Sequence, residues 1–246
     1  MGLTIHYNLK SSTRSPKKAR ELVARLRGRA LDLPFERVDD IIELSGPACD
    51  YEQCGLDHPH RWLLIQSGAY VDDPRDKHFS YRVKPTHVIA FSTWPGQGCE
   101  DANFGLCRYP AYIEVQDRVL RGQTRKLPTR LGGWCWGSFC KTQYASNPEC
   151  GGVANFLHCH LIVIRMLDHA KELGILRSVS DEGDFWEKRN IEDLSREVGQ
   201  WNEMIAGLAG ELKDKLGDEV LSAITKFANF EHIKAKGRSQ SQGTAV

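Results

Sequence analysis

The sequence lacks a long apolar run. No window approaches the roughly 18 apolar residues that a membrane-spanning helix requires, and the first residues, MGLTIHYNLK, do not have the basic-then-apolar pattern of an export signal. A myristoylation motif also fails, because it needs Ser or Thr where this chain has His6. We therefore expect a cytoplasmic protein with no membrane partner.

The sequence also lacks an excess of charge of either sign. It has 33 Lys and Arg against 32 Asp and Glu, and residues 1–150 are only slightly more basic than residues 151–246. This balance argues against a strongly electrostatic nucleic-acid binder. One basic cluster on a predicted helix is typical of a solvated face, with weak nucleic-acid binding as the alternative. The cluster consists of Lys17, Lys18, Arg20, Arg25, Arg27 and Arg29.

No internal repeat or low-complexity linker divides the 246 residues. Hydrophobic residues at 41% and charged residues at 26% are typical of a globular chain. We predict a single α+β domain over residues 1–234. Residues 235–246, AKGRSQSQGTAV, have the composition of a disordered tail.

The order of hydrophobic patterns predicts the fold class. Residues 3–9 alternate as in a strand, Ser15 and Pro16 begin an amphipathic helix over 16–31, and residues 38–44 form a second strand rich in Ile and Val. We expect this β-α-β unit to join a mixed, largely antiparallel sheet. A C-terminal layer of packed helices should cover about residues 154–234.

Two helices dominate that layer. Residues 154–177 are apolar around most of the helix, whereas the apolar residues of 191–216 recur in alternating steps of three and four. We expect the second helix to pack closely on the first. Homodimer formation through residues 191–216 is the alternative.

The eight cysteines are expected to be thiols, metal ligands or a nucleophile rather than disulfides, because no export signal accompanies them. Four of them lie between Leu131 and His160, with two tryptophans and two histidines. If this stretch begins as an inner strand, Trp134 and Trp136 share one face and Cys135 lies on the other. The thiols would then serve as small hydrophobic groups.

Three functional interpretations compete with that structural one. Cys140 or Cys135 could be a nucleophile with a histidine at 158–160 as its base. Cys135, Cys140 and Cys150 could instead bind a metal with one histidine, since helical spacing separates His158 from His160. The aromatic residues could also anchor a partner protein.

Two further segments contribute polar groups to such a site. On helix 154–177, the side chains of His158, Arg165 and His169 align with Glu172 as a polar stripe, which is either the exposed face or one wall of a cleft. In the loop 94–101, a ligand could contact the tryptophan and approach the backbone at the glycines, with an acid nearby for proton transfer. These loop residues are Trp94, Gly96, Gly98 and Glu100.

Residues 49–60, CDYEQCGLDHPH, are the best candidate for a zinc site. Thiolate and imidazole are the ligands that zinc prefers, and four of them occur within twelve positions. The candidate ligands are Cys49, Cys54, His58 and His60. An ordinary polar loop is the alternative.

No complete catalytic motif can be identified, so two main hypotheses are carried forward. The first is an enzyme, a hydrolase, with a cysteine- or metal-dependent site between loop 94–101, residues 131–150 and helix 154–177. Its catalytic residues would be Cys140, His158, His169 and Glu100, and its binding residues Trp94, Gly96, Gly98, Trp134, Trp136 and Arg165. The second is a non-enzymatic, zinc-stabilised module that binds another protein.

Overall fold

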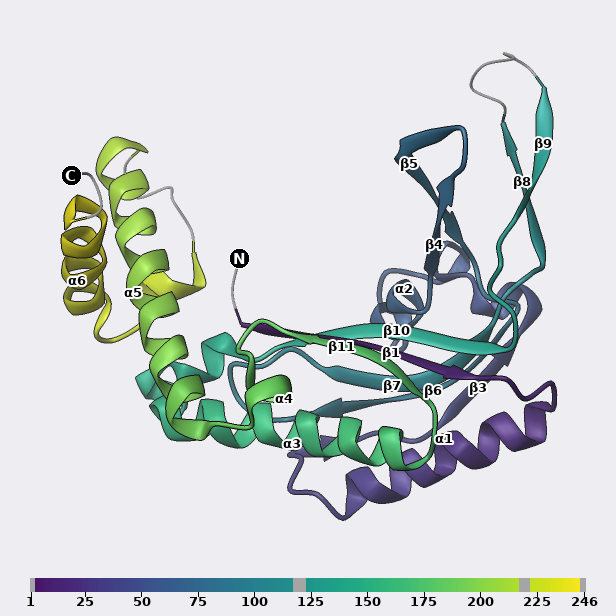
Figure 1. Cartoon of the computed structure of the whole chain (residues 1–246), viewed down its shortest axis with the longest axis horizontal. Coiled ribbons are helices and arrows are strands. Elements are labelled where there is room, and N and C mark those ends of the chain that lie inside the picture. Colours follow the sequence, from purple (N-terminus) through teal and green to yellow (C-terminus); the bar gives the residue numbers. More distant parts are fainter. Residues whose placement is uncertain (1–2, 117–122, 217–221, 244–246) are drawn as a thin grey trace.

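The computed structural model describes residues 3–116, 123–216 and 222–243. It has an α+β fold, in which the main antiparallel sheet carries two long helices on one face (Figure 1). This confirms the predicted fold class. None of the helices in the described residues is long and apolar enough to cross a lipid bilayer.

The chain begins as the sequence predicts. Strand β1 (Thr4–Ser11) leads to helix α1 (Pro16–Leu31), where the Ser15 side chain accepts a hydrogen bond from the Lys18 N–H and Pro16 occupies the first turn. The apolar face of α1 is fully buried on the sheet and consists of Ala19, Val23, Leu26 and Ala30.

The main sheet has the strand order β11-β1-β10-β7-β6-β2, with β3 also paired to β6. Its strands are β2 (Arg37–Val38), β3 (Ile42–Ser45), β6 (His87–Trp94), β7 (Ala102–Arg108), β10 (Trp134–Lys141) and β11 (Leu176–Asp181). All the pairings between these described strands are antiparallel. Three strands separate β1 from β2 and β3, so the two ends of the N-terminal β-α-β unit are not neighbours.

The predicted strand 38–44 forms two short strands, because the chain is interrupted between Val38 and Ile42. Arg27 of α1 bonds to the residues of this interruption. Its Nε donates to the Asp39 carbonyl at 2.7 Å and its guanidinium pairs with Asp40 at 2.8 Å. The Asp39 carbonyl is therefore bonded to the helix.

The two faces of the sheet are covered differently (Figure 1). Helix α1 and helix α3 (Gly152–Glu172) lie on one face. The other carries the short helix α2 (Arg61–Gln66) and two projecting hairpins, β4 (Ala69–Asp73) with β5 (Asp76–Val83), and β8 (Tyr112–Gln116) with β9 (Thr124–Pro128). The buried carboxylate of Asp73 joins the hairpins, because it pairs with Arg125 and accepts from Tyr81.

The sheet opens between β10 and β7. These strands share a single backbone register pair, Cys135 with Cys107. Beyond it, Tyr7 and Trp136 fill the gap, since the Tyr7 hydroxyl and the Trp136 Nε1–H donate to the same carbonyl, that of Asn103, at 2.7 and 2.9 Å. Two side chains thus replace the backbone ladder there.

The C-terminal helices are α4 (Phe185–Lys188), α5 (Ile191–Leu216) and α6 (Phe230–Gly243). Short 3-10 turns occur at Gly46–Cys49, Tyr51–Gln53, Gln143–Ser146, Pro148–Cys150 and Ala223–Lys226. Helix α5 has the predicted bounds. Only its first part, with Leu194 and Val198, joins the main core, and its later part packs on α6 rather than on α3.

The prediction of a disordered tail from residue 235 is wrong for residues 235–243, which continue α6. Residues 244–246 lie outside the described residues. The helix is ordered because it closes a second hydrophobic cluster with α5, in which Gly237 approaches the Glu203 backbone directly. Its buried members are Ala206, Ala209, Ile224, Phe227, Phe230 and Ile233.

Candidate functional site

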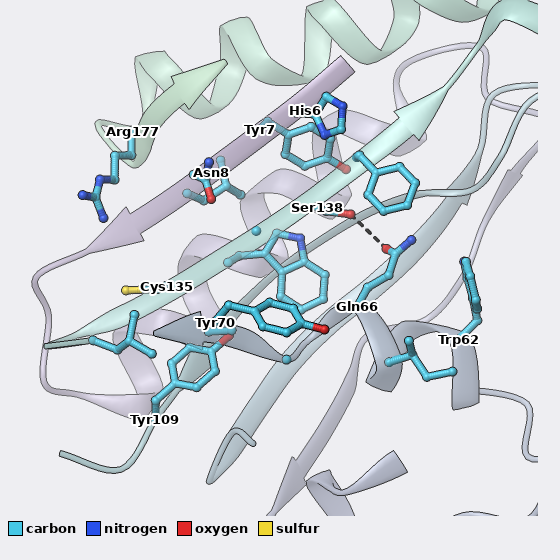
Figure 2. Close-up of a pocket in the computed structure, with 18 residues that line it drawn as sticks. His6, Tyr7, Asn8, Trp62, Gln66, Tyr70, Tyr109, Cys135, Ser138 and Arg177 are labelled. Atoms are coloured by element: carbon cyan, nitrogen blue, oxygen red, sulfur yellow. Dashed lines mark hydrogen bonds between the residues drawn. The ribbon is translucent and has the colours of Figure 1, made fainter. Parts of the chain in front are cut away.

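An aromatic cleft of about 600 Å³ lies on the face of the sheet opposite α1 and α3 (Figure 2). Strands β1 and β10 line one side of it, and α2 and the start of β4 line the other. The cleft adjoins the opening between β10 and β7. Its aromatic side chains are Tyr7, Trp62, Tyr70, Tyr109, Trp136 and Phe139.

Two of these rings are open to solvent. The exposed fraction is 51% for Trp62 and 67% for Tyr70, although both are large apolar groups. Tyr109 is buried, and its hydroxyl donates to the Ser67 carbonyl at 2.7 Å. Exposed aromatic rings beside a cleft are typical of a surface that binds something flat or apolar.

Gln66 supplies an unused hydrogen-bond donor to the cleft. Its Oε1 accepts from the Asn103 amide at 2.6 Å. It also accepts from the Ser138 hydroxyl at 2.9 Å, as Figure 2 shows. Its Nε2 is buried and has no partner among the described residues. A buried donor without a partner costs free energy, so a ligand that accepts this hydrogen bond would gain binding energy.

Arg177 is the one formally charged side chain among the described residues that line the cleft. A β-bulge directs it there. Asn8 pairs with Ser178 and Leu9 pairs with Leu176, so Arg177 is the extra residue on β11. Its exposed guanidinium makes the cleft suitable for an anion.

Cys135 lies in the same cleft. Burial raises the pKa of its thiol, while the positive charges of Lys10 and Arg177 act in the opposite direction. The thiol is therefore neutral at pH 7. Lys10 lies opposite Cys135 in the register of β1 and β10, and Arg177 lines the cleft, so both cations are beside this thiol.

The three segments predicted to form a site do meet, but at a different place. The Asn155 amide of α3 donates to the carbonyls of Gln97 and Ala145 at 3.0 and 3.1 Å. The Cys140 thiol donates to the Glu100 carbonyl at 3.3 Å. Loop 94–101, the end of β10 and the start of α3 are thereby held together.

The loop glycines are needed for packing. Gly98 has φ +80°, and a Cβ there would lie 2.5 Å from the Tyr144 carbonyl oxygen. A Cβ at Gly96 would lie 3.0 Å from the Cys159 sulfur. The Trp94 Nε1–H donates to the Cys99 carbonyl at 3.3 Å within the same loop. The backbone at these glycines therefore lies close to other parts of the chain, in the position where the sequence suggested a ligand.

A group of thiols lies where these segments meet. Hydrogen bonding with Cys99 lowers the pKa of Cys159 despite its burial, and the same bond raises the pKa of Cys99. Burial raises the pKa of Cys140, and the charge of Glu100 adds to this rise. Cys159 is thus the thiol with the greater thiolate character, but it is completely buried.

The structure does not bring Cys140 and His158 together in a cleft. Cys140 is completely buried, whereas His158 is exposed on α3. The buried histidine is His160, whose Nδ1 lies 3.0 Å from the Thr142 hydroxyl and whose Nε2 lies 3.2 Å from Asp181. Because α3 turns about 100° per residue, two positions separate an outward side chain from an inward one.

The other predicted site residues are dispersed. Arg165 and Glu100 are exposed, and His169 is bonded to Glu172 at 3.1 Å on the outer side of α3. The stripe is therefore exposed at His158 and Arg165, whereas His169 and Glu172 line a groove with α1. Trp134 is buried edge-on against His87, so Cys135 and Trp136 are the predicted candidates that line the cleft.

The four candidate zinc ligands do not converge. Cys49 is buried, the Cys54 thiol donates to the Asp50 carbonyl at 3.7 Å, and the His58 and His60 rings lie 5.8 Å apart. Within the described ranges, no three His, Cys, Asp or Glu side chains form a group that could hold a metal ion. Zinc binding stays a prediction, and elemental analysis of the purified protein would test it.

Comparisons with protein-family models, with curated protein sequences and with solved structures find no match to this chain. The cleft is thus the basis for a functional proposal. Sequence reasoning missed its principal groups, Gln66, Tyr70 and Arg177. The only sequence signal was the unusual density of aromatic residues that includes Trp136.

Proposed function

We propose that the protein binds a small, flat organic molecule carrying an anionic group in the aromatic cleft. The observation that carries this proposal is the combination of exposed rings with Arg177 as the one formal charge among the described lining residues. Flat rings bury area against aromatic side chains, and a guanidinium pairs with carboxylate, sulfonate or phosphate. A concave apolar surface with a few polar groups is the usual form of a ligand site.

Binding of 1-anilinonaphthalene-8-sulfonate, a flat aromatic anion, tests the proposal. Arg177→Gln should weaken its binding about tenfold or more, because a charge-assisted hydrogen bond is lost. Tyr70→Ala should also weaken it. The measurement is a fluorescence titration of the dye with each purified protein.

Arg196→Gln is the matched control, since Arg196 is an exposed arginine of α5 paired with Asp193 away from the cleft. It should bind the dye as the wild type does. Equal affinities of the wild type, Arg177→Gln and Tyr70→Ala would place the dye elsewhere and overturn the proposal.

A second candidate function is the predicted cysteine-dependent hydrolase, now centred on Cys159 rather than Cys140. The lowered pKa of Cys159 and its bond with Cys99 favour it. Complete burial opposes it, because a nucleophile must reach its substrate. Mass-spectrometric mapping of iodoacetamide labelling would support this function only if Cys159 reacts faster than Cys54, which is partly exposed.

An exposed apolar row on α5 supports the predicted formation of a homodimer. Exposed apolar side chains recur every four residues along α5, at Met204, Leu208 and Leu212, with exposed fractions of 45%, 56% and 40%. Light scattering of the wild type and of Leu208→Lys would test it. A monomer at every concentration contradicts self-association.

A further inference from the structure

Beside the aromatic cleft, alternate side chains of three strands form an exposed surface. His6, Asn8 and Lys10 of β1 are exposed, as are Ser178 and Ser180 of β11. His6 is paired with Phe139 on one side and Ser180 on the other. Side chains in register point to the same face, so they extend the cleft surface across the sheet.

This surface offers both rings and hydrogen-bonding groups. The His6 and Phe139 rings lie 5.8 Å apart across the strands. In the next register row, the Asn8 amide donates to the Ser178 hydroxyl at 3.1 Å, opposite Gly137. A Cβ at Gly137 would lie 3.0 Å from Asn8 Oδ1, so the glycine keeps this row flat.

The charge of the surface is positive. Asp181 is the only carboxylate in these three described strands, and it is buried against His160. Lys10 and Arg177 are exposed. Lys10 is in register opposite Cys135, and Arg177 lines the cleft. Cations therefore face solvent beside the rings without an opposing carboxylate on the same strands.

We propose, on the basis of the proposed ligand site, that this surface binds a nucleobase joined to phosphate, as in a free nucleotide or single-stranded RNA or DNA. A base stacks on the Tyr70 ring, and the Gln66 Nε2–H donates to its edge. Phosphate pairs with Arg177 and Lys10. Stacking on exposed rings together with cations along a groove is how proteins bind unpaired strands without sequence preference.

A nucleobase explains more of the site than an acidic peptide does. Both ligands would pair with Lys10 and Arg177, but a peptide does not require open rings such as Trp62 and Tyr70. Every base has a flat π face and a polar edge, which match the exposed rings and the unused Gln66 donor. The modest number of cations agrees with the near-zero net charge of the chain.

Fluorescence anisotropy with a labelled single strand of about ten nucleotides, as uridine RNA and as thymidine DNA, tests the proposal. Tyr70→Ala should weaken binding about five- to a hundredfold. Lys10→Ala should make the slope of log K against log salt shallower by about 0.7. Competition with uridine monophosphate distinguishes a free nucleotide from a single strand as the preferred ligand. If the monophosphate displaces the labelled strand fully at an equal concentration of nucleotides, the ligand is the free nucleotide. If it displaces the strand less well, the ligand is the strand.

Lys18→Ala is the control, because Lys18 is an exposed lysine on α1, away from the cleft. It should bind as the wild type does. If Lys18→Ala weakens binding while Tyr70→Ala does not, the basic helix is the binding surface and the proposal is overturned. Dye binding without oligonucleotide or nucleotide binding overturns this inference alone. Failure of all three ligands to bind overturns the ligand site as well.

Discussion

Burial of the Cys140 thiol indicates a structural role for this residue rather than a catalytic one. Its thiol is completely enclosed and bonded to the Glu100 carbonyl, and its pKa is raised by burial. A thiol in such a position acts as a small hydrophobic group. His158, which the sequence suggested as its base, is on the outer surface of α3.

We therefore expect Cys140→Ala to lower the free energy of unfolding by about 1–2 kcal/mol, because it leaves a small cavity and an unpaired carbonyl. His158→Ala should change it by less than about 0.5 kcal/mol. Urea unfolding of both variants measures these differences. Loss of dye binding in His158→Ala without loss of stability would contradict the placement of this residue away from the cleft.

Asp181 makes stability depend on pH. Burial would raise its pKa, but hydrogen bonds from His160 and from the N–H groups of Gly183 and Trp186 outweigh burial and lower it. A carboxylate whose folded pKa is depressed stabilises the fold fully above its unfolded pKa, about 3.9. This contribution is lost as the pH falls through the folded value.

Asp181→Asn should consequently be less stable than the wild type above about pH 5, and the difference should shrink below about pH 4. Urea unfolding across this range measures it. Asp40→Asn is the control, because the Asp40 side chain is 96% exposed. A difference that grows toward low pH would refute this role of the carboxylate.

At the scale of elements, the contact of α6 with α5 depends on glycine. A Cβ at Gly237 would overlap the Glu203 carbonyl, whereas at Gly199 of α5 nothing lies within 4 Å. Glycine normally weakens a helix interior by about 0.5–1 kcal/mol relative to alanine. The two substitutions should therefore have opposite effects.

Gly199→Ala should stabilise the protein by up to about 1 kcal/mol. Gly237→Ala should destabilise it by about 1–3 kcal/mol through overpacking and should make α6 more sensitive to protease. Thermal unfolding and limited proteolysis measure both effects. If Gly237→Ala is as stable as Gly199→Ala, the helices do not make this contact.

The same contact shows why the sequence misled about residues 235–243. Their polar, glycine-containing composition gives weak helix propensity, but tertiary packing stabilises the helix once Gly237 meets the Glu203 backbone. The spacing of apolar residues was sufficient to predict elements with a continuous apolar face, such as α1 and α5. It was insufficient to predict a segment whose conformation depends on contact with a distant part of the chain.

At the scale of the whole molecule, the fold class could be predicted from sequence patterns, whereas most of the cleft could not. The burial of alternate residues in β1 and every third or fourth residue in α1 follows from local periodicity. The cleft joins Gln66, Ser138 and Arg177, which lie far apart in the chain. Arg177 reaches it through a bulge, and no periodic signal reports a bulge.

The place of β1 between β10 and β11 has a consequence for synthesis of the chain. Its two neighbours, β10 and β11, end at Lys141 and Asp181, so neither exists when β1 leaves the ribosome. At roughly 5–20 residues per second, this strand waits about ten to thirty seconds before both of its edges can pair. During that time its backbone N–H and C=O groups are unpaired along both edges and are open to pairing with other chains.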